Sequence, residues 1–215
     1  MVDKPIALED RAADVQRLFS PSAARNRDPI LDALQSILPP QGSMLEIASG
    51  TGEHVVHFAR GLPGWRFQPT EFDEASRQSV RAWIAHEGLA NIAAPVTLDA
   101  SAGVWPVESA GPVDAVLSLN MIHIAPWAAA QGLFRGAGRV LKPGGLLLLY
   151  GPFQEDGVHN APSNAAFDES LRARDPDWGV RDIRDLQALA NDNGLTLRER
   201  QAMPANNQIL VFVKA

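Results

Sequence analysis

Short apolar runs alternate with helix-like segments along most of the chain, and this alternation constrains the fold more than any other feature. The apolar runs predict strands at 43–48, 65–72, 94–100, 113–122 and 146–151. The segments between them carry apolar residues at helical spacing and predict helices at 53–62, 74–88 and 126–141. Strands that alternate with helices at this spacing form a parallel sheet with helices on both faces.

The two ends of the pattern complete the expected fold. Near the start, Asp28 followed by Pro29 reads as the N-cap and first position of a helix that Pro39 and Pro40 end. Near the finish, strands at 195–203 and 207–215 are joined by the segment PANN, whose last residue begins the second strand, and this connection is too short for a parallel crossover. The prediction is an α/β, Rossmann-like fold with a seven-stranded, mostly parallel sheet and an antiparallel edge strand.

The organisation along the chain indicates a single domain, because 215 residues without repeats or linkers suit one core. We expect one domain over 1–215, with a polar N-terminal arm at 1–25. The segment 151–181 is long, polar and rich in turn formers, and it follows a strand. Such an insertion at the carboxyl end of a strand is a candidate cap over a ligand site.

Composition excludes several classes of function. A net charge of −6 and a pI near 5.3 argue against sequence-independent binding of nucleic acid. The absence of cysteine excludes disulfides, thiolate metal sites and a cysteine nucleophile. The chain begins without the apolar centre of a signal peptide, and no run approaches the roughly 18 to 20 apolar residues of a membrane span. We therefore expect a cytoplasmic protein that does not associate with membranes.

Polar residues and glycines gather where the predicted strands end. Ligands of open parallel sheets bind at the carboxyl ends of the strands, near the point where strand order reverses. The residues at these ends are Gly50, Gly52, Glu71, Asp99, Asn120, Tyr150 and Gly151. They predict one binding site assembled from several strand ends.

The glycine-rich turn fits a phosphate poorly. Read as the dinucleotide pattern Gly-x-Gly-x-x-Gly, its places fall on Ala48, Gly50 and Glu53. A carboxylate at Glu53, in the first turn of the helix, would repel a pyrophosphate. No Gly-Lys-Ser/Thr follows, so a Walker loop fits worse. The turn favours a cationic or zwitterionic ligand.

The motifs at these strand ends resemble those of the class I S-adenosylmethionine-dependent methyltransferases. The first motif of that class, an acidic residue followed by x-Gly-x-Gly-x-Gly, is matched by Glu46, Ala48, Gly50 and Gly52. The segment RVLKPGGLLLLYG and the two closing strands are also similar to that class. The resemblance covers about residues 26 to 215. The segments RNRDPIL, LEIASGTGEH, NMIHIAPW and MPANN resemble a small, poorly characterised branch of it.

The resemblance implies S-adenosylmethionine as cofactor, S-adenosylhomocysteine as product, and a role for each matched residue. Glu71 would bind the ribose hydroxyls, and Asp99 with the Ala100 backbone would contact adenine. Glu46 would touch the methionine end of the ligand or anchor the loop. Carboxylates suit these contacts because they accept charge-assisted hydrogen bonds from hydroxyl and amino groups. Asn120 completes the cofactor-binding set, and Ala48 departs from the glycine of the family.

Other residues are candidates for the acceptor side. His123 is a candidate catalytic base, and Tyr150 could orient an acceptor. The resemblance places Asn26 and Arg27 where they could close over the site. Polar residues near the expected mouth are Asn160, Asn164, Asn206 and Asn207. His54 and His57 lie three apart on a helix, but no third ligand is evident and no metal is expected.

The function we expect is that of an S-adenosylmethionine-dependent methyltransferase with a small-molecule acceptor. Asn120 to His123 does not match the Asn/Asp-Pro-Pro-aromatic motif of many amino-group methyltransferases, which further argues against nucleic acid as partner. One alternative is a module that binds the cofactor without turnover. Another is an NAD(P)-dependent oxidoreductase, which the loop spacing and the closing strands disfavour. Acceptor, acceptor atom and oligomeric state stay open.

Overall fold

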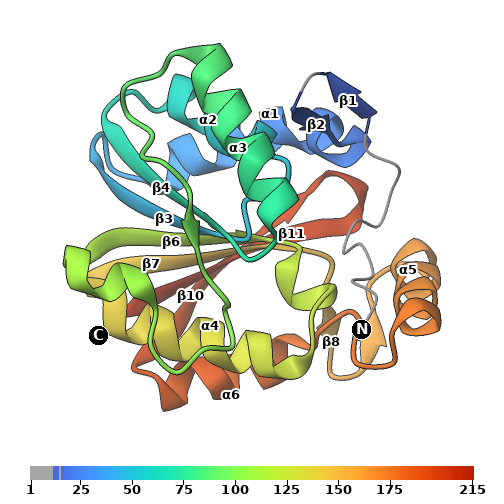
Figure 1. Ribbon diagram of the computed structural model, residues 1–215. Helices are drawn as coiled ribbons and strands as arrows, with labels where there is room; N and C mark the ends of the chain where they lie inside the picture. Colours follow the sequence, from blue (N-terminus) through green and yellow to red (C-terminus); the bar gives the residue numbers. More distant parts are fainter. Residues whose placement is uncertain (1–11, 15) are drawn as a thin grey trace.

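A seven-stranded sheet forms the centre of the molecule in the computed structural model, which describes residues 12–14 and 16–215 (Figure 1). The strand order is β10-β11-β7-β6-β3-β4-β5. The bounds are β3 (Gly42–Ile47), β4 (Trp65–Glu71), β5 (Val96–Thr97), β6 (Val113–Leu119), β7 (Leu141–Gly151), β10 (Leu195–Met203) and β11 (Asn207–Lys214). This arrangement confirms the predicted fold class.

The pairing of the strands places the point where strand order reverses between β3 and β6. The neighbouring strands from β5 through β4, β3 and β6 to β7 pair in parallel. The chain proceeds outward from β3 to β4 and β5, and then returns to β6 and β7 on the other side. Only β11 runs in the opposite direction, since it pairs antiparallel with both β7 and β10. The closing antiparallel pair is therefore confirmed, with its reversed strand one place in from the edge.

Helices cover both faces of the sheet, as expected for buried parallel strands. On one face lie α1 (Pro21–Ile37), α2 (Glu53–Gly61) and α3 (Glu74–Glu87), and on the other lie α4 (Trp127–Val140) and α6 (Ile183–Asp192) (Figure 1). Alternate residues of β3 serve the two cores: Met44 packs in the first, and Leu45 in the second. None of the helices within the described part of the chain is long and apolar enough to cross a bilayer.

The first helix begins eight residues before the position expected from the sequence. Ser20, and not Asp28, is its N-cap, with the Ser20 side chain accepting a hydrogen bond of 3.2 Å from the Ala23 amide. Pro21 takes the first helical position, where proline lacks only a hydrogen bond that would be unmade anyway. Pro29 therefore lies inside α1, although it cannot donate a backbone hydrogen bond there. The Asp28 assignment was wrong because the sequence carries two start signals of the same kind.

The segments at the two edges of the domain have structure that the sequence analysis did not assign. The expected arm, 1–25, holds a short hairpin of β1 (Ala12–Asp14) and β2 (Arg17–Phe19) before α1, while 1–11 and 15 lie outside the described residues. The candidate cap, 151–181, contains a small hairpin of β8 (Gln154–Glu155) and β9 (Val158–His159), and a helix, α5 (Pro162–Arg174). Figure 1 shows α5 apart from the two helical layers.

Glycines on α4 bring the loop after β5 into contact with that helix. A Cβ atom built on Gly132 would lie 2.0 Å from the backbone oxygen of Ala100, and one on Gly136 would lie 2.2 Å from the Trp105 ring. Separations this short cannot exist between real atoms, so only glycine permits this approach. The two glycines thus fix the position of the loop that carries Asp99 and Ala100.

We predict that Gly132→Ala lowers the free energy of unfolding by about 1–3 kcal/mol, since the added methyl group forces the loop off α4. Gly103→Ala is the matched control, because a Cβ atom there meets open space. The control should change stability by less than about 0.5 kcal/mol. Urea denaturation of both variants tests this, and equal stabilities would contradict the packing argument.

Candidate functional site

The loop after β3 lies at the point where strand order reverses, and its backbone is left-handed at three alternate residues. Ala48, Gly50 and Gly52 have φ angles of 61°, 59° and 92°. At Gly52 a side chain is excluded for a second reason, since a Cβ atom would lie 2.8 Å from the Cα of Val80 on α3. Left-handed backbone favours glycine at all three positions, and Ala48 adopts it in spite of its Cβ atom.

Glu71 at the end of β4 holds this loop in place. One carboxylate oxygen, Oε2, accepts a hydrogen bond of 2.8 Å from the Gly50 amide. The other, Oε1, accepts from the amides of Phe72 and Asp73 at 2.8 and 3.2 Å. The residue is buried, and burial raises the pKa of its carboxyl while the three amide hydrogen bonds oppose that rise. Glu71 is therefore a fixed acceptor at the junction of two strand ends.

Glu46 and Ser49 present buried polar atoms that the protein leaves unsatisfied. Burial raises the pKa of the Glu46 carboxyl to about 7, and the nearby Ser49 hydroxyl opposes that rise. Within the described residues, neither Glu46 Oε2 nor Ser49 Oγ has a hydrogen-bond partner. Buried polar atoms without partners are rare and costly in proteins. Their presence beside a glycine-rich loop indicates a place for a polar ligand group, such as an ammonium.

The loop after β5 adds a second carboxylate to the rim of the site. Asp99 is exposed, and its Oδ1 accepts hydrogen bonds from the backbone and side chain of Ser101 at 2.8 and 2.7 Å. These bonds fix the carboxylate with one oxygen engaged. Ala100 follows it and lies against α4. Asp99 is thus the exposed acid of the predicted set, whereas Glu46 and Glu71 are buried.

Phe72 is a residue of this region that the sequence analysis did not select. It directly follows Glu71, and 60% of its surface is exposed. A single exposed apolar side chain is common on protein surfaces, so it is the place of Phe72, directly after the strand-end carboxylate Glu71, that makes it a candidate. An apolar residue immediately after a strand-end acid is the sequence signal that could have identified it.

A segment of the N-terminal arm, residues 17–20, is attached to the same loop. The Ser20 amide donates to Glu53 Oε2 at 2.6 Å, and the Thr51 hydroxyl donates to the same oxygen at 3.0 Å. The Leu18 amide donates to Ser79 Oγ, which itself donates to the Thr51 carbonyl at 2.6 Å. Glu53 therefore joins the arm to the N-terminus of α2, in addition to placing a negative charge there.

The candidates Asn26 and Arg27 lie on α1, and Asn26 is beside Tyr150. Asn26 Oδ1 lies 2.8 Å from His54 Nε2, and the Asn26 side chain also hydrogen-bonds to Tyr150. Burial raises the pKa of the Tyr150 hydroxyl, so it keeps its proton at neutral pH. The Nε atom of Arg27 is buried without a partner among the described residues. The structure thus brings Asn26 and Tyr150, two of the predicted acceptor-side residues, together with His54.

His123 is further from solvent than a general base usually is. Its ring is fully buried and packs edge-on against Phe153 at 5.2 Å, and its Nε2 has no partner in the described chain. Burial and the nearby Arg181 charge lower the pKa of His123 to about 3. Asn120 has a φ angle of 58°, and its backbone N–H donates a hydrogen bond of 2.8 Å to the backbone carbonyl of Tyr150. The His123 imidazole is therefore neutral and a weak base.

Asn164 and Asn206 attach the cap to the turn between β10 and β11. Asn164 Nδ2 donates to the Asn206 carbonyl at 2.9 Å and to Asn160 Oδ1 at 2.6 Å. Asn206 Nδ2 donates to Ser163 Oγ at 3.2 Å. A cavity of about 460 Å³ lies beside this contact, and Asn160, Asn206 and Asn207 line it. The predicted mouth residues do lie together, and their contacts connect α5 to the sheet.

We predict that Ala48→Gly raises the free energy of unfolding by about 0.5–1 kcal/mol. Left-handed backbone costs alanine about 1–2 kcal/mol, and the greater unfolded-state freedom of glycine offsets part of this gain. Ala128→Gly, on the exposed side of α4, is the control and should destabilise the protein. Chemical denaturation measures both variants. A loss of stability in Ala48→Gly that equals the loss in the control would refute the strain at Ala48.

We predict that Glu46→Gln is more stable than the wild type at pH 8, and that this advantage is smaller at pH 5. The folded-state pKa of about 7 exceeds 4.5, the usual pKa of a glutamate side chain in water. Stability from this group is therefore fully present below pH 4.5, and it falls as the pH rises through 7. The advantage of the variant should grow by about 2 kcal/mol between pH 5 and pH 8. Denaturation at both pH values tests this, with exposed Glu169→Gln as control, and a constant difference would contradict it.

Comparison with solved structures places this site in a known architecture. A protein described as an O-methyltransferase family protein from Burkholderia thailandensis superposes with a TM-score of 0.76 at 17% identity, over 90% of this chain and 57% of its own. Mitomycin 7-O-methyltransferase MmcR superposes with a TM-score of 0.76 at 17% identity, over 90% of this chain and 54% of its own. CalO1 is described as a methyltransferase in calicheamicin biosynthesis, in its S-adenosylhomocysteine-bound form. It superposes with a TM-score of 0.74 at 17% identity, over 90% of this chain and 54% of its own.

These likenesses establish the fold. The chain has the fold of class I S-adenosylmethionine-dependent methyltransferases, and it spans just over half the length of these three structures. A family model also matches residues 17–214, and its description is "Protein of unknown function (DUF938)".

Proposed function

We propose that this chain, which belongs to the family described as "Protein of unknown function (DUF938)", is an S-adenosylmethionine-dependent methyltransferase with a small-molecule acceptor. The observation that carries the proposal is the junction of Glu71 with the Gly50 amide, at the end of the strand next to β3. Such a junction fixes a carboxylate beside the glycine-rich loop at the point where strand order reverses, where open sheets bind ligands.

Adenosine matches the groups on the rim of this site. It carries two ribose hydroxyls and one adenine amino group as donors, and Glu71 and Asp99 supply carboxylate acceptors on adjacent strand ends. It also has an apolar aromatic face, for which the exposed ring of Phe72 is a partner. These contacts need no cationic side chain.

The methionine end of the cofactor matches the unsatisfied atoms beneath the loop. An ammonium group would supply the donor that Glu46 Oε2 and Ser49 Oγ lack. It would also favour the charged form of Glu46, so that affinity would rise as the pH passes through about 7. When bound, the cofactor supplies a methyl group on a sulfonium, and the protein contributes alignment and exclusion of water.

The groups on the acceptor side support a reaction without a strong base. His123 has a pKa of about 3, far from the value at which a general base works best at neutral pH. Tyr150 keeps its proton and can donate a hydrogen bond to an acceptor. We propose that Tyr150, positioned by Asn26, orients an acceptor whose nucleophilic atom is already unprotonated. Arg27 and the cap would shape the rest of the pocket.

Calorimetry with S-adenosylhomocysteine and with NADH tests the choice of cofactor. We expect saturable binding of S-adenosylhomocysteine and none of NADH, because the Glu53 carboxylate in the first turn of α2 disfavours a pyrophosphate. Tight binding of NADH without binding of S-adenosylhomocysteine would overturn the proposal in favour of an oxidoreductase.

We predict that Glu71→Ala, Asp99→Ala and Phe72→Ala each weaken S-adenosylhomocysteine binding by roughly 1–3 kcal/mol, the scale of a lost charged hydrogen bond or stacking contact. Val104→Ala is the matched control for Phe72→Ala, since Val104 is also apolar and 73% exposed. Circular dichroism would verify that each variant folds. Unchanged affinity in all three variants would refute the assigned pocket.

Turnover separates an enzyme from a module that only binds the cofactor. Purified protein would be incubated with methyl-labelled cofactor and fractionated metabolite extract. Transfer of label to a small molecule, lost in Asp99→Ala at limiting cofactor, is the expected result. Binding of S-adenosylhomocysteine without transfer to any fraction would support the binding module.

A further inference from the structure

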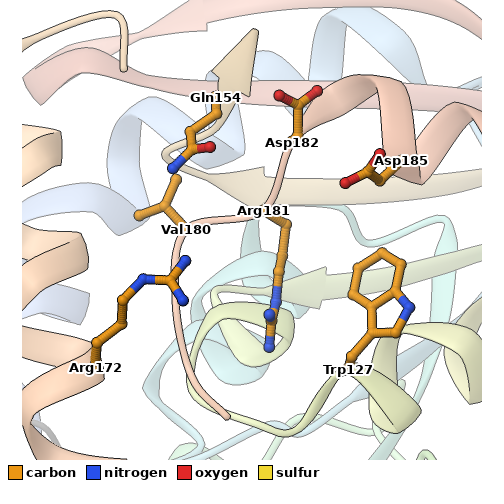
Figure 2. A pocket seen from close by; sticks show the side chains of 7 residues that line it. All are labelled: Trp127, Gln154, Arg172, Val180, Arg181, Asp182 and Asp185. Carbon is orange, nitrogen blue, oxygen red and sulfur yellow. The ribbon is translucent and has the colours of Figure 1, made fainter. Parts of the chain in front are cut away.

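A cavity of about 200 Å³ lies between α4, α5 and α6, on the opposite face of the sheet from α2 (Figure 2). Its walls come from the first residue of α4, from α5 and from the segment that enters α6. The lining residues are Trp127, Gln154, Arg172, Val180, Arg181, Asp182 and Asp185. This volume holds roughly six or seven water molecules, which suits a small metabolite or a small part of a larger one.

Arg181 brings a half-buried positive charge to this cavity. Its Nε donates to the Ile122 carbonyl at 2.8 Å, and its Nη2 donates to the carbonyls of Ala125 and Asp177 at 2.7 and 2.8 Å. All three partners are neutral carbonyl groups. Within the described residues the Nη1 group makes no hydrogen bond, and no carboxylate bonds to this guanidinium. Burial and the neighbouring charge of Arg172 lower the pKa of Arg181, which marks a charge without full compensation.

Arg172 supplies further donors on the same side of the cavity. Its Nε bonds to Asp168 Oδ2 at 3.0 Å, while its two terminal nitrogens make no hydrogen bond to described residues. Asp168 is shared, because its other oxygen accepts from the Val180 amide at 2.7 Å. Figure 2 shows both guanidinium groups in the space between α5 and Trp127. Two arginines with unused donors can bind a carboxylate in the forked geometry that guanidinium groups favour.

The start of α4 reinforces this preference for a negative charge. Trp127 is the first residue of the helix, which has neither a side-chain cap nor an acidic residue in its first turn. The Arg181 guanidinium lies 5.5 Å from the Trp127 ring and bonds to Ala125 just before the helix. The positive end of the helix dipole therefore points into the same region as the two arginines.

The acidic residues of the cavity limit the charge of the ligand. Asp182 caps α6, with Oδ1 accepting from the Arg184 amide and Oδ2 from the Gly157 amide. Asp185 lies in the first turn of α6 and interacts with Arg184 at 3.5 Å. Both carboxylates are thus engaged with α6 and its surroundings, yet they still repel an approaching dianion. A singly charged anion fits the balance of charges better than a phosphate.

We propose that this cavity is a second ligand site, which takes the carboxylate of a small organic acid on Arg172 and Arg181. The site is separate from the cofactor loop and does not depend on the proposed methyltransferase function. It is connected to the acceptor side through the backbone, since the Gly179 amide bonds to the His123 carbonyl at 2.9 Å. Occupancy would hold the segment 177–182 against α4.

Titration of the full chain with acetate, in the absence of cofactor and at constant ionic strength, tests the proposal. We expect saturable binding by calorimetry, a rise of the melting temperature with acetate concentration, and weaker binding of inorganic phosphate and of glycine. Arg172→Gln should weaken acetate binding about tenfold, the scale of a lost charge-assisted hydrogen bond. Arg174→Gln, an exposed arginine on the same helix, is the matched control and should bind as the wild type does.

Two further variants keep the test independent of folding and of the cofactor site. Asp185→Asn should strengthen acetate binding at least about twofold, because it removes a repelling charge without removing a donor. Glu71→Ala should leave acetate binding unchanged. Absence of saturable binding, equal affinity of Arg172→Gln and wild type, or tighter binding of phosphate or glycine than of acetate would each overturn the proposal.

Discussion

The contact between the Glu71 carboxylate and the Gly50 amide is the interaction on which the site depends. It spans 21 residues of sequence and joins the ends of two adjacent strands. Because Glu71 also accepts from the two amides that follow it, the carboxylate cannot rotate away. The glycine-rich loop, the start of α2 and the exposed ring of Phe72 all take their positions from this group. A buried carboxylate used in this way gives rigidity to a loop that otherwise has three left-handed residues.

Several groups in this region lower the stability of the free protein. Ala48 has left-handed backbone, Glu46 is a buried acid with a pKa of about 7, and Ser49 has a buried hydroxyl without a partner among the described residues. Strain and unsatisfied polar groups at one place are expected where a protein is arranged for a ligand, because the ligand supplies the missing partners. The same logic applies to Arg181 on the opposite face, whose guanidinium bonds only to carbonyl groups within the described residues.

Much of the fold was predictable from the sequence, and the exceptions have physical reasons. The strands and most helices follow from periodicity, which is a local property. The start of α1 was misplaced because Ser20-Pro21 and Asp28-Pro29 carry equivalent local signals. Helix α5 was not predicted from the sequence because its buried residues are Asn164, Asp168 and Leu171, which leave it almost no apolar stripe. Polar residues are buried there because they bond to distant partners, among them Asn206 and Val180.

The sequence by itself determined the alternation of strands and helices, and it placed Glu46, Gly50, Glu71 and Asp99 at the ends of strands. Local spacing carries this information, since the carboxyl ends of parallel strands meet at one edge. Only the tertiary structure decided which carboxylate is buried, which is exposed, and that Phe72 remains in water. It also decided that Arg172 and Arg181 share a cavity. These properties depend on contacts between residues far apart in the chain, and no local pattern records them.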